Sequence, residues 1–254
     1  MDLGLKGKVA IVTGTGRKGA LGETIGVGLA REGVNVACVD IVKEGAEEIA
    51  KGIAENTGVK TIAIKVDQSD PQQVKDAVVK INAELGPVDI LVNNAALMGP
   101  FGRIEKMELK DWQAMIKVNL DGCYYWIREV WNTMAEKNYG RIINISSVAG
   151  VMGGFGQVNY SASKAGVIAI AKTAALEGAR KGITANAVTL GVVATGQSAE
   201  TNEASERLKM RIAMRKFGDP EDVANMVAFL ASEKAGYVTG QDIHVMGGID
   251  LFTY

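Results

Sequence analysis

Three residues in the middle of the chain, Ser147, Tyr160 and Lys164, have the types and spacing that proton transfer requires. Tyr160 and Lys164 are four residues apart, so a helix would carry both side chains on one face. An ammonium group beside a phenol favours the phenolate, and we therefore expect Lys164 to lower the pKa of Tyr160 from its ordinary value of about 10. A tyrosine in that state can exchange a proton at neutral pH.

Ser147 follows an apolar run over 141–145, which predicts a buried strand with the serine hydroxyl at its tip. Ligands of open α/β sheets bind at the carboxyl ends of the strands, so this position suits a site. A Tyr-x-x-x-Lys pair taken alone is usually an ordinary pair on a helix surface. The serine upstream and a glycine-rich turn near the start of the chain favour a functional site instead.

Apolar runs bounded by Gly, Asp or Asn alternate along the chain with segments of helical period. The runs are continuous, as in strands covered on both faces. They predict an α/β fold with one Rossmann-like, doubly wound parallel sheet of about seven strands and helices on both faces. The predicted strands are 8–13, 35–40, 61–66, 90–93, 141–145, 184–188 and 242–245. The predicted helices are 21–32, 43–56, 71–85, 109–137, 160–180 and 220–231.

No composition shift divides the chain, and we expect a single domain over 1–254. The polar segment 191–217 follows the end of a predicted strand, and long connections in compact domains are often lids. We expect this segment to form a lid over the substrate. A plain surface helix with flexible flanks is the alternative.

A glycine-rich turn, residues 14–22, joins the first predicted strand to the first predicted helix. Glycine there lets the backbone approach a pyrophosphate, and the helix N-terminus supplies amide groups. Asp40 ends the second predicted strand, where a carboxylate accepts hydrogen bonds from ribose hydroxyls and repels a 2′-phosphate. These features predict a dinucleotide site that takes NAD. Arg17 and Lys18 in the turn favour NADP instead, although Asp40 is placed directly at the ribose.

Several motifs, taken in order, resemble the short-chain dehydrogenase/reductase family over nearly the whole chain. They are Val12-Thr13-Gly14, Asn93-Asn94-Ala95, Asn119 within Lys117-Val118-Asn119-Leu120, and the set Ser147, Tyr160 and Lys164. The resemblance implies hydride transfer between a nicotinamide and an alcohol or ketone. The chain departs from the family pattern in a glycine-rich turn that is two residues longer, in Ala96 for a glycine, and in Leu190 for a proline.

The resemblance also implies roles for single residues. Tyr160 would be the acid/base, Ser147 would hold the reacting oxygen, and Lys164 would depress the tyrosine pKa and bind the nicotinamide ribose. Asn119 would interrupt its helix and hold a water that relays protons to Lys164. The residues implied at the cofactor are Gly14, Gly16, Arg17, Ala20, Leu21, Gly22, Asp40, Ile41, Asp67, Gln68, Asn93, Ala95, Ala96, Tyr160, Lys164, Gly191, Val193 and Thr195. The residues implied beside the substrate are Leu97, Met98, Ser147, Val148, Met152, Phe155, Leu190 and Val192.

The substrate-side residues are apolar and include no arginine or lysine to pair with a carboxylate or phosphate. We therefore expect hydride transfer between NAD(H) and a small or medium hydrophobic secondary alcohol or ketone. NADP-dependent reduction of a 3-oxoacyl thioester is the alternative, because the segment from Ser147 to Lys164, with Gly156-Gln157 inside it, is similar to such reductases. Arg128, Arg180 and Lys181 are then candidates to meet the charge of an acyl carrier. A non-catalytic dinucleotide-binding regulator and a scaffold protein are alternatives from other classes, which the intact catalytic set disfavours.

The composition excludes several other classes. The net charge is −1 and the basic residues are dispersed, so no nucleic-acid or anionic-membrane surface is expected. No apolar run reaches the length of a membrane span, and the first residues lack the apolar core of a signal peptide, so we expect a cytoplasmic protein. His244 is the single histidine, and Cys38 and Cys123 lie far apart. We therefore expect no metal site, a structural histidine, and reduced, buried cysteines.

The family resemblance implies a homotetramer. The two long predicted helices, 109–137 and 160–180, carry wide apolar faces that a single sheet does not easily cover. The residues that define these faces are Tyr124, Trp131, Ile168 and Ala171.

Overall fold

The computed structural model describes residues 2–195 and 203–251. Within these residues, seven strands form one sheet in the order β3-β2-β1-β4-β5-β6-β7, with every neighbouring pair parallel. This is the doubly wound sheet that the sequence predicted. The strands are β1 (Val9–Thr13), β2 (Asn35–Asp40), β3 (Thr61–Lys65), β4 (Ile90–Asn93), β5 (Gly140–Ser147), β6 (Ile183–Leu190) and β7 (Asp242–Val245).

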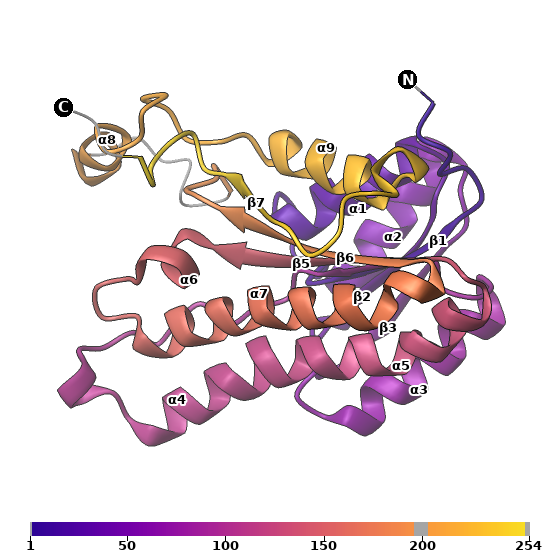
Figure 1. The fold of residues 1–254 in the computed structure, drawn as a ribbon, viewed down its shortest axis with the longest axis horizontal. Coiled ribbons are helices and arrows are strands. Elements are labelled where there is room, and N and C mark those ends of the chain that lie inside the picture. The colour runs from indigo at the N-terminus through magenta and orange to yellow at the C-terminus, as the bar shows by residue number, and fades with distance from the viewer. Residues whose placement is uncertain (1, 196–202, 252–254) are drawn as a thin grey trace.

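Helices cover both faces of the sheet (Figure 1). They are α1 (Leu21–Arg31), α2 (Lys43–Thr57), α3 (Pro71–Glu84), α4 (Leu109–Ile116), α5 (Gly122–Glu136), α6 (Val148–Met152), α7 (Val158–Gly178), α8 (Glu203–Lys209) and α9 (Pro220–Ala231). Apolar residues of α1, α2 and α9 pack with Ala10 and Val12 of β1, whereas those of α3, α5 and α7 pack with Val9 and Ile11. Every position of β1 is therefore buried, which explains its unbroken apolar sequence.

Two strands extend further than predicted. β5 reaches from Gly140 to Ser147, and β6 from Ile183 to Leu190. The prediction was shorter because both strands also contain buried polar side chains, which do not fit an apolar pattern. Asn144, Ser146 and Thr189 interrupt the apolar sequence, but each of them forms a hydrogen bond to a neighbouring segment. The extension carries the tips of both strands to one edge of the sheet.

The predicted helix over 109–137 is divided. α4 and α5 are joined by a π-helical turn, Lys117–Asp121, that contains Asn119. The helix predicted from 160 begins earlier, at Val158, and its end is continued by a 3-10 turn, Ala179–Lys181. The strand at 61–66 and the other predicted helices agree with the structure to within one or two residues.

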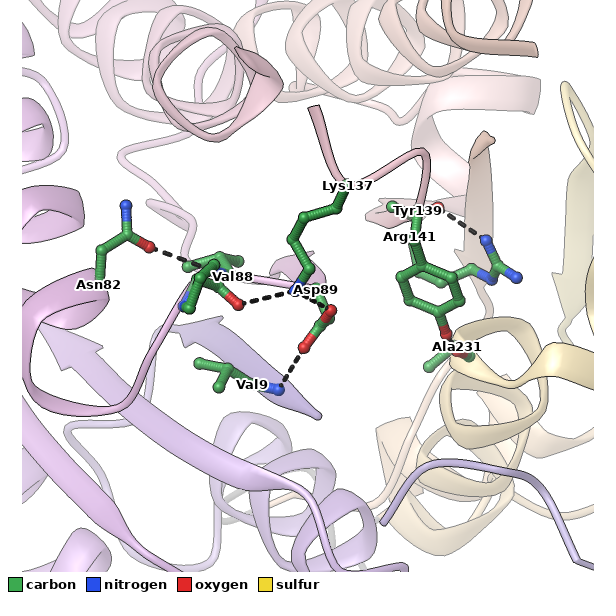
Figure 2. A network of polar contacts seen from close by, with 10 residues as sticks. Val9, Asn82, Val88, Asp89, Lys137, Tyr139, Arg141 and Ala231 are labelled. Atoms are coloured by element: carbon green, nitrogen blue, oxygen red, sulfur yellow. Dashed lines mark hydrogen bonds and ion pairs between the residues drawn. The ribbon is translucent and has the colours of Figure 1, made fainter. Parts of the chain in front are cut away.

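Polar contacts tie the amino ends of the central strands together, as Figure 2 shows. The Asp89 carboxylate accepts hydrogen bonds from the main-chain amide of Val9, at 2.9 Å, and from the Lys137 ammonium. The buried guanidinium of Arg141 donates to three main-chain oxygens, which belong to Gly140, Gly182 and Ser232. It also lies against the ring of Tyr139, at 4.3 Å from its centre. These charged side chains therefore stabilise the amino-terminal ends of the strands, at the opposite end of the sheet from Ser147.

The apolar face proposed for a subunit contact is partly used within the chain. Ile168 and Ala171 are buried and pack with Ala187 of β6, so the sheet does cover them. Tyr124 is half exposed and Trp131 is partly buried. Our expectation that all four residues need a second copy of the chain was therefore wrong for Ile168 and Ala171. Cys38 and Cys123 are free and buried, as expected.

The two ends of the expected lid segment pair with each other just after β6. Val192 O accepts a hydrogen bond from Gly218 N at 2.9 Å, and Gly218 O accepts one from Ala194 N at 2.9 Å. Residues 196–202 of this segment lie outside the described residues. On its return, Met214 N donates to Gly247 O at 3.0 Å, which joins the segment to the chain after β7.

Candidate active site

A cavity of about 760 Å³ follows the carboxyl ends of the central strands. Its walls include Thr13 of β1, Asp40 of β2, Asn94 after β4, Ser147 of β5 and Leu190 of β6. Ligands of open α/β sheets bind at this edge, beside the point where the strand order reverses. Here that point lies between β1 and β4.

The first turn brings backbone atoms very close together. Gly14 has a φ of +79°, and a Cβ added to Gly22 would stand 2.0 Å from the main-chain oxygen of Gly14. Only glycine fits at Gly22, because the first turn of α1 packs directly on the end of β1. The N-cap residue of α1 is Ala20, and no side chain caps this helix. The amide groups of its first turn therefore remain available to an anion.

Asn94 fastens the loop after β4 to this turn. Its side-chain amide donates to Thr13 O at 2.8 Å, and the Thr13 hydroxyl accepts from the main-chain amides of Asn94 and Ala95, both at 3.0 Å. We expected Asn93 to line the cofactor site, but it does not line the cavity. Asn93 is buried behind the cavity, where its amide donates to the Asn144 side chain at 2.9 Å.

The Asp40 carboxylate is held by the main chain on both sides. Oδ2 accepts from Gly16 N at 2.8 Å, and Oδ1 accepts from Val42 N at 2.9 Å. Gly16 therefore faces Asp40 and does not line the cavity, in contrast to our expectation. Arg17 does line the cavity, whereas Lys18 forms an exposed ion pair with Glu48 at 3.3 Å.

Most of the predicted site residues lie together in the wall of the cavity. They are Gly14, Arg17, Ala20, Leu21, Gly22, Asp40, Ile41, Asp67, Gln68, Ala95, Ala96, Leu97, Met98, Ser147, Val148, Tyr160, Lys164, Leu190, Gly191, Val192, Val193 and Thr195. Five predicted residues do not line it: Gly16, Asn93, Asn119, Met152 and Phe155.

Met152 and Phe155 miss the cavity because of the short helix α6. Met152 is exposed at the end of that helix, and Phe155 follows it. Phe155 lies in a second, more open hollow between α6, the start of α7 and residues 102–105. Its ring is 5.4 Å from the guanidinium carbon of Arg103. Neither side chain therefore borders the part of the cavity that contains Tyr160.

Several residues of the wall were not among the predicted site residues, although Thr13, Asn94 and Gln157 belong to motifs that the sequence analysis quoted. The full set is Thr13, Val39, Val66, Asn94, Val118, Ile145, Ser146, Ala149 and Gln157. Thr13, Val39 and Ile145 lie at or near strand ends next to predicted residues, so the strand ends alone could have identified them. Gln157 comes one helical turn before Tyr160. That spacing is the signal for its position in the wall.

Ser147, Tyr160 and Lys164 come from two adjacent elements. Ser147 ends β5 and caps α6, because its hydroxyl accepts a hydrogen bond from Ala149 N at 3.2 Å. The cap uses the hydroxyl as an acceptor and leaves its proton to the Tyr160 side of the cavity. Tyr160 and Lys164 are successive inward residues at the start of α7, and both are buried. The Tyr160 ring also has an edge-to-face contact with Phe101.

The electrostatics differ from our expectation that Lys164 lowers the pKa of Tyr160. Burial raises the pKa of Tyr160, and a hydrogen bond from Ser147 partly offsets that rise. Burial also lowers the pKa of Lys164 to about 8. The Lys164 ammonium is 5.8 Å from the centre of the Tyr160 ring and donates instead to Ile145 O at 2.8 Å. Desolvation therefore has a larger effect on the phenol than the nearby lysine.

Asn119 lies beside the cavity wall in the π-helical turn. Its Oδ1 accepts from Leu97 N at 2.7 Å, and its Nδ2 donates to Leu97 O at 3.1 Å and to the Ser163 hydroxyl at 3.3 Å. Asn119 therefore joins the loop after β4 to α7. A second side chain contacts the same π-helical turn, because Gln68 Nε2 donates a hydrogen bond to Val118 O at 2.8 Å. The interruption of the helix at Asn119 agrees with the sequence, and the water relay stays a prediction.

The cavity fits a dinucleotide. Glycine backbone and uncapped helix amides at Gly14 and Leu21 suit a pyrophosphate, the Asp40 carboxylate suits ribose hydroxyls, and Lys164 stands at the opposite end. All of these groups line one cavity. The structure therefore contains the contacts that each part of a nicotinamide dinucleotide needs.

Within the described residues, no group of three or more His, Cys, Asp and Glu side chains is arranged to hold a metal ion. His244 instead lies between two carboxylates, Asp250 at 2.9 Å and Asp242 at 3.3 Å, which raise its pKa although burial opposes the shift. No helix in the described part of the chain has the length and hydrophobicity to cross a bilayer.

A family model described as enoyl-(acyl carrier protein) reductase matches residues 14–250. The chain belongs to the short-chain dehydrogenase/reductase family. It is therefore an oxidoreductase that uses a nicotinamide dinucleotide, and the fold and motifs of this family account for the cavity described above.

Relatives and a solved structure of this family align with nearly the whole chain. The 3-oxoacyl-(acyl-carrier-protein) reductase FabG of Staphylococcus epidermidis is 39% identical over 246 residues, which cover 95% of this chain and 98% of that protein. Nodulation protein G of Azospirillum brasilense is 41% identical over 246 residues, with 96% and 98% covered. The crystal structure of NAD⁺-bound xylitol dehydrogenase has a TM-score of 0.90 and 28% identity, and covers 96% of this chain and 99% of its own.

Proposed function

We propose that this dehydrogenase/reductase interconverts a 3-oxoacyl thioester and the corresponding 3-hydroxyacyl thioester, with NAD(H) as its preferred cofactor. The observation that carries the proposal is the position of Gln157 in the same cavity as Ser147 and Tyr160, among apolar side chains. The similarity to 3-oxoacyl-(acyl-carrier-protein) reductases along nearly the whole chain supports the same substrate class.

Gln157 supplies a second hydrogen-bond donor near the reacting group. A 3-oxoacyl thioester has two carbonyl groups separated by one carbon, so a site for it needs donors at two neighbouring points. Ser147 and Tyr160 serve the 3-oxo oxygen, and the Gln157 amide, one helical turn before Tyr160, serves the thioester oxygen. The main-chain N–H of Gln157 donates a hydrogen bond to Gly154 O at 3.0 Å, which fixes the backbone at this residue.

The remaining wall beside Tyr160 suits an acyl chain. Leu97, Met98, Val148, Leu190 and Val192 are apolar and line the cavity. Methionine and leucine side chains adapt to a flexible hydrocarbon, and burial of each CH₂ group contributes about 0.8 kcal/mol to binding. We infer that the protein binds an acyl group of short or medium length in this part of the cavity.

Each catalytic side chain has one task in this proposal. During reduction, the Tyr160 hydroxyl donates its proton to the 3-oxo oxygen, and during oxidation the phenolate takes a proton back from the hydroxyl group. Ser147 donates a hydrogen bond to the same oxygen and holds it in place. Lys164 holds the nicotinamide ribose. The dinucleotide, when bound, supplies or accepts the hydride.

The preference for NAD(H) rests on Asp40. Its carboxylate lines the cavity at the end of β2, where a 2′-phosphate would meet a negative charge. Arg17 lines the same region and opposes this preference, whereas Lys18 is directed to Glu48. We give Asp40 the larger weight because the main chain holds it in position on both sides.

The cationic residues considered earlier for an acyl carrier do not line this cavity. Arg180 and Lys181 follow the end of α7, a helix of 21 residues, so they lie about 30 Å along its axis from Tyr160 at its start. Arg128 is exposed on α5, near Glu129 at 3.7 Å. Within one protein chain, these three residues therefore do not pair with the negative charge of an acyl carrier bound beside Tyr160.

The test compares kcat/KM for a 3-oxoacyl thioester and for a neutral cyclic ketone, each with NADH and NADPH. We expect the thioester with NADH to be preferred, and Gln157→Leu to remove most of that preference while the neutral ketone is unaffected. A preference for the neutral ketone, unchanged by Gln157→Leu, would support our second candidate, a hydrophobic alcohol dehydrogenase, which the uncharged substrate wall favours. Cofactor binding without turnover of either substrate would support a non-catalytic regulator.

A further inference from the structure

Two buried side chains of β5 form hydrogen bonds to the main chain of α7. The Ser146 hydroxyl donates to Lys164 O at 2.8 Å, and the Asn144 amide donates to Val167 O at 3.0 Å. Asn144 and Ser146 are both almost fully buried. The bonds matter for the site because β5 carries Ser147, whereas α7 carries Tyr160 and Lys164.

The two bonds fix the position and the direction of the helix together. Asn144 and Ser146 are alternate residues of a strand, so they point to the same face of the sheet. Lys164 and Val167 are three residues apart, so their carbonyl groups lie on one side of the helix. A single bond would allow α7 to pivot on β5, but two bonds at successive points along both elements prevent this.

These bonds are additional to those that the helix needs. Lys164 and Val167 lie inside α7, where each carbonyl already accepts the amide four residues later. Satisfaction of buried main-chain groups therefore does not explain the side chains on β5. A buried hydrogen bond adds little net stability over apolar groups of the same shape, so two such bonds between these elements point to a geometric role.

A third residue sets the orientation of Asn144. Asn93 is paired with Asn144 across β4 and β5, and its amide donates to Asn144 Oδ1 at 2.9 Å. Because Oδ1 accepts this bond, Nδ2 of Asn144 is the atom directed at α7. In the opposite direction, the Lys164 ammonium donates to Ile145 O at 2.8 Å. The strand and the helix are thus joined at three consecutive residues of β5, immediately before Ser147.

We propose that Asn144 and Ser146 are positioning residues, which set the seating of α7 on β5 and thereby hold the Tyr160 phenol against the Ser147 hydroxyl. This inference rests on the proposed roles of Ser147 and Tyr160. It assigns to Asn144, and to Asn93 behind it, a function in the geometry of the site without contact with substrate or cofactor. A displacement of about 1 Å between reacting groups costs on the order of 100-fold in rate.

The test uses Asn144→Ala and Ser146→Ala, with Asn186→Ala as the matched control. Asn186 of β6 is equally buried and also forms two hydrogen bonds, to Val238 O at 2.8 Å and from Gln241 N at 3.0 Å, but neither reaches α7. One readout is kcat against KM. The other is ultraviolet titration of the Tyr160 phenol, obtained as the difference between each protein and the same protein with Tyr160→Phe.

We expect Asn144→Ala and Ser146→Ala to lower kcat by about 10- to 100-fold with little change in KM, and to raise the titration midpoint of Tyr160, because the Ser147 hydrogen bond is weakened. Asn186→Ala should lose stability without either effect. If Asn144→Ala and Ser146→Ala behave like Asn186→Ala, the bonds are only structural and the inference is overturned. Ser146→Ala removes a single heavy atom and serves where Asn144→Ala does not fold. Because Ser146 also borders the cavity, the cofactor dissociation constant is measured for this variant, and a positioning role predicts that it is unchanged.

The failure of this inference is distinct from the failure of the proposed function. Turnover retained by Tyr160→Phe would overturn the function of Tyr160 as the acid. The titration observes the phenol directly and would still decide whether Asn144 and Ser146 hold it against Ser147.

Discussion

Asp40 Oδ2 accepts a hydrogen bond from the main-chain amide of Gly16 at 2.8 Å. This contact joins the end of β2 to the lengthened glycine-rich turn, so the residue expected at the ribose also shapes the loop beside it. A Cβ added to Gly16 would stand only 2.4 Å from the Asp40 carboxylate, and one added to Gly45 of α2 would stand 1.8 Å from Gly16 O. Glycine at both positions lets the turn lie between Asp40 and α2.

Replacement of Asp40 should therefore change cofactor selection. We predict that Asp40→Ala lowers the ratio of NADH to NADPH affinity by at least tenfold, which corresponds to about 1.4 kcal/mol, because repulsion of the 2′-phosphate is lost together with the anchor of Gly16. The measurement is the dissociation constant of each cofactor by nicotinamide fluorescence. Lys18→Ala is the control, since Lys18 is exposed and paired with Glu48. An unchanged ratio in Asp40→Ala would refute the assignment, and a wild-type preference for NADPH would indicate that Arg17 dominates.

Two glycine substitutions should have opposite effects. Gly22→Ala would place a Cβ 2.0 Å from Gly14 O, which is main chain and cannot rotate away. We predict a loss of about 1–3 kcal/mol of stability and of most dinucleotide affinity. Gly52→Ala in α2 meets no atom within 4 Å and should stabilise the helix by about 0.5–1 kcal/mol, with normal affinity. Urea unfolding and cofactor titration measure both effects, and normal binding by Gly22→Ala would contradict the site.

Lys164 should make folding stability depend on pH. Burial lowers its pKa from 10.5 to about 8, so the folded protein binds fewer protons than the unfolded chain between these values. Burial of the charged ammonium therefore lowers the free energy of unfolding by its full amount, on the order of 3 kcal/mol, below about pH 8. This destabilisation disappears as the pH rises toward 10.5.

We predict that the stability of Lys164→Met, relative to the wild type, declines as the pH rises through this window. The absolute difference also contains the cost of leaving Ile145 O without its partner, about 1–3 kcal/mol, so the informative quantity is the change with pH. Denaturant unfolding at several pH values measures it. Parallel stability profiles for the two proteins would show that the lysine is not strongly desolvated.

The proposed homotetramer is tested by sedimentation. Exposed apolar side chains such as Leu109 and Tyr124 lie on the helices α4 and α5, where a second copy of the chain would cover them. We predict a tetramer at micromolar concentration. A monomer would contradict the proposal.

The sequence predicted the order of strands and helices well, because the central strands β1 and β4 are unbroken runs of buried residues and the other strands are separated from one another by segments of helical period. It failed where polar residues are buried inside an element. Ser146 and Thr189 form hydrogen bonds within the fold, and the predicted strands ended just before these two residues. The spacing of Tyr160 and Lys164 did place both at the cavity.

The expected effect of Lys164 on the Tyr160 pKa was wrong for a related reason. Sequence spacing gives the proximity of two side chains, but it does not give their burial or the third group that one of them contacts. Here the Lys164 ammonium bonds to Ile145 O, and burial dominates the pKa of Tyr160. Asn93 and Asn94 illustrate the same limit, since adjacent residues at a strand end point to opposite sides and only the structure shows which one faces the cavity.

The most direct test of the central claim is single-turnover oxidation of bound NADH by a 3-oxoacyl thioester, followed by nicotinamide absorbance in the wild type and in Tyr160→Phe. We predict that both proteins bind NADH equally well, that the wild type converts the thioester, and that the variant is slower by at least about 100-fold, as expected for loss of a general acid. A near-normal rate in Tyr160→Phe, or no conversion of the thioester by the wild type with either NADH or NADPH, would contradict the account.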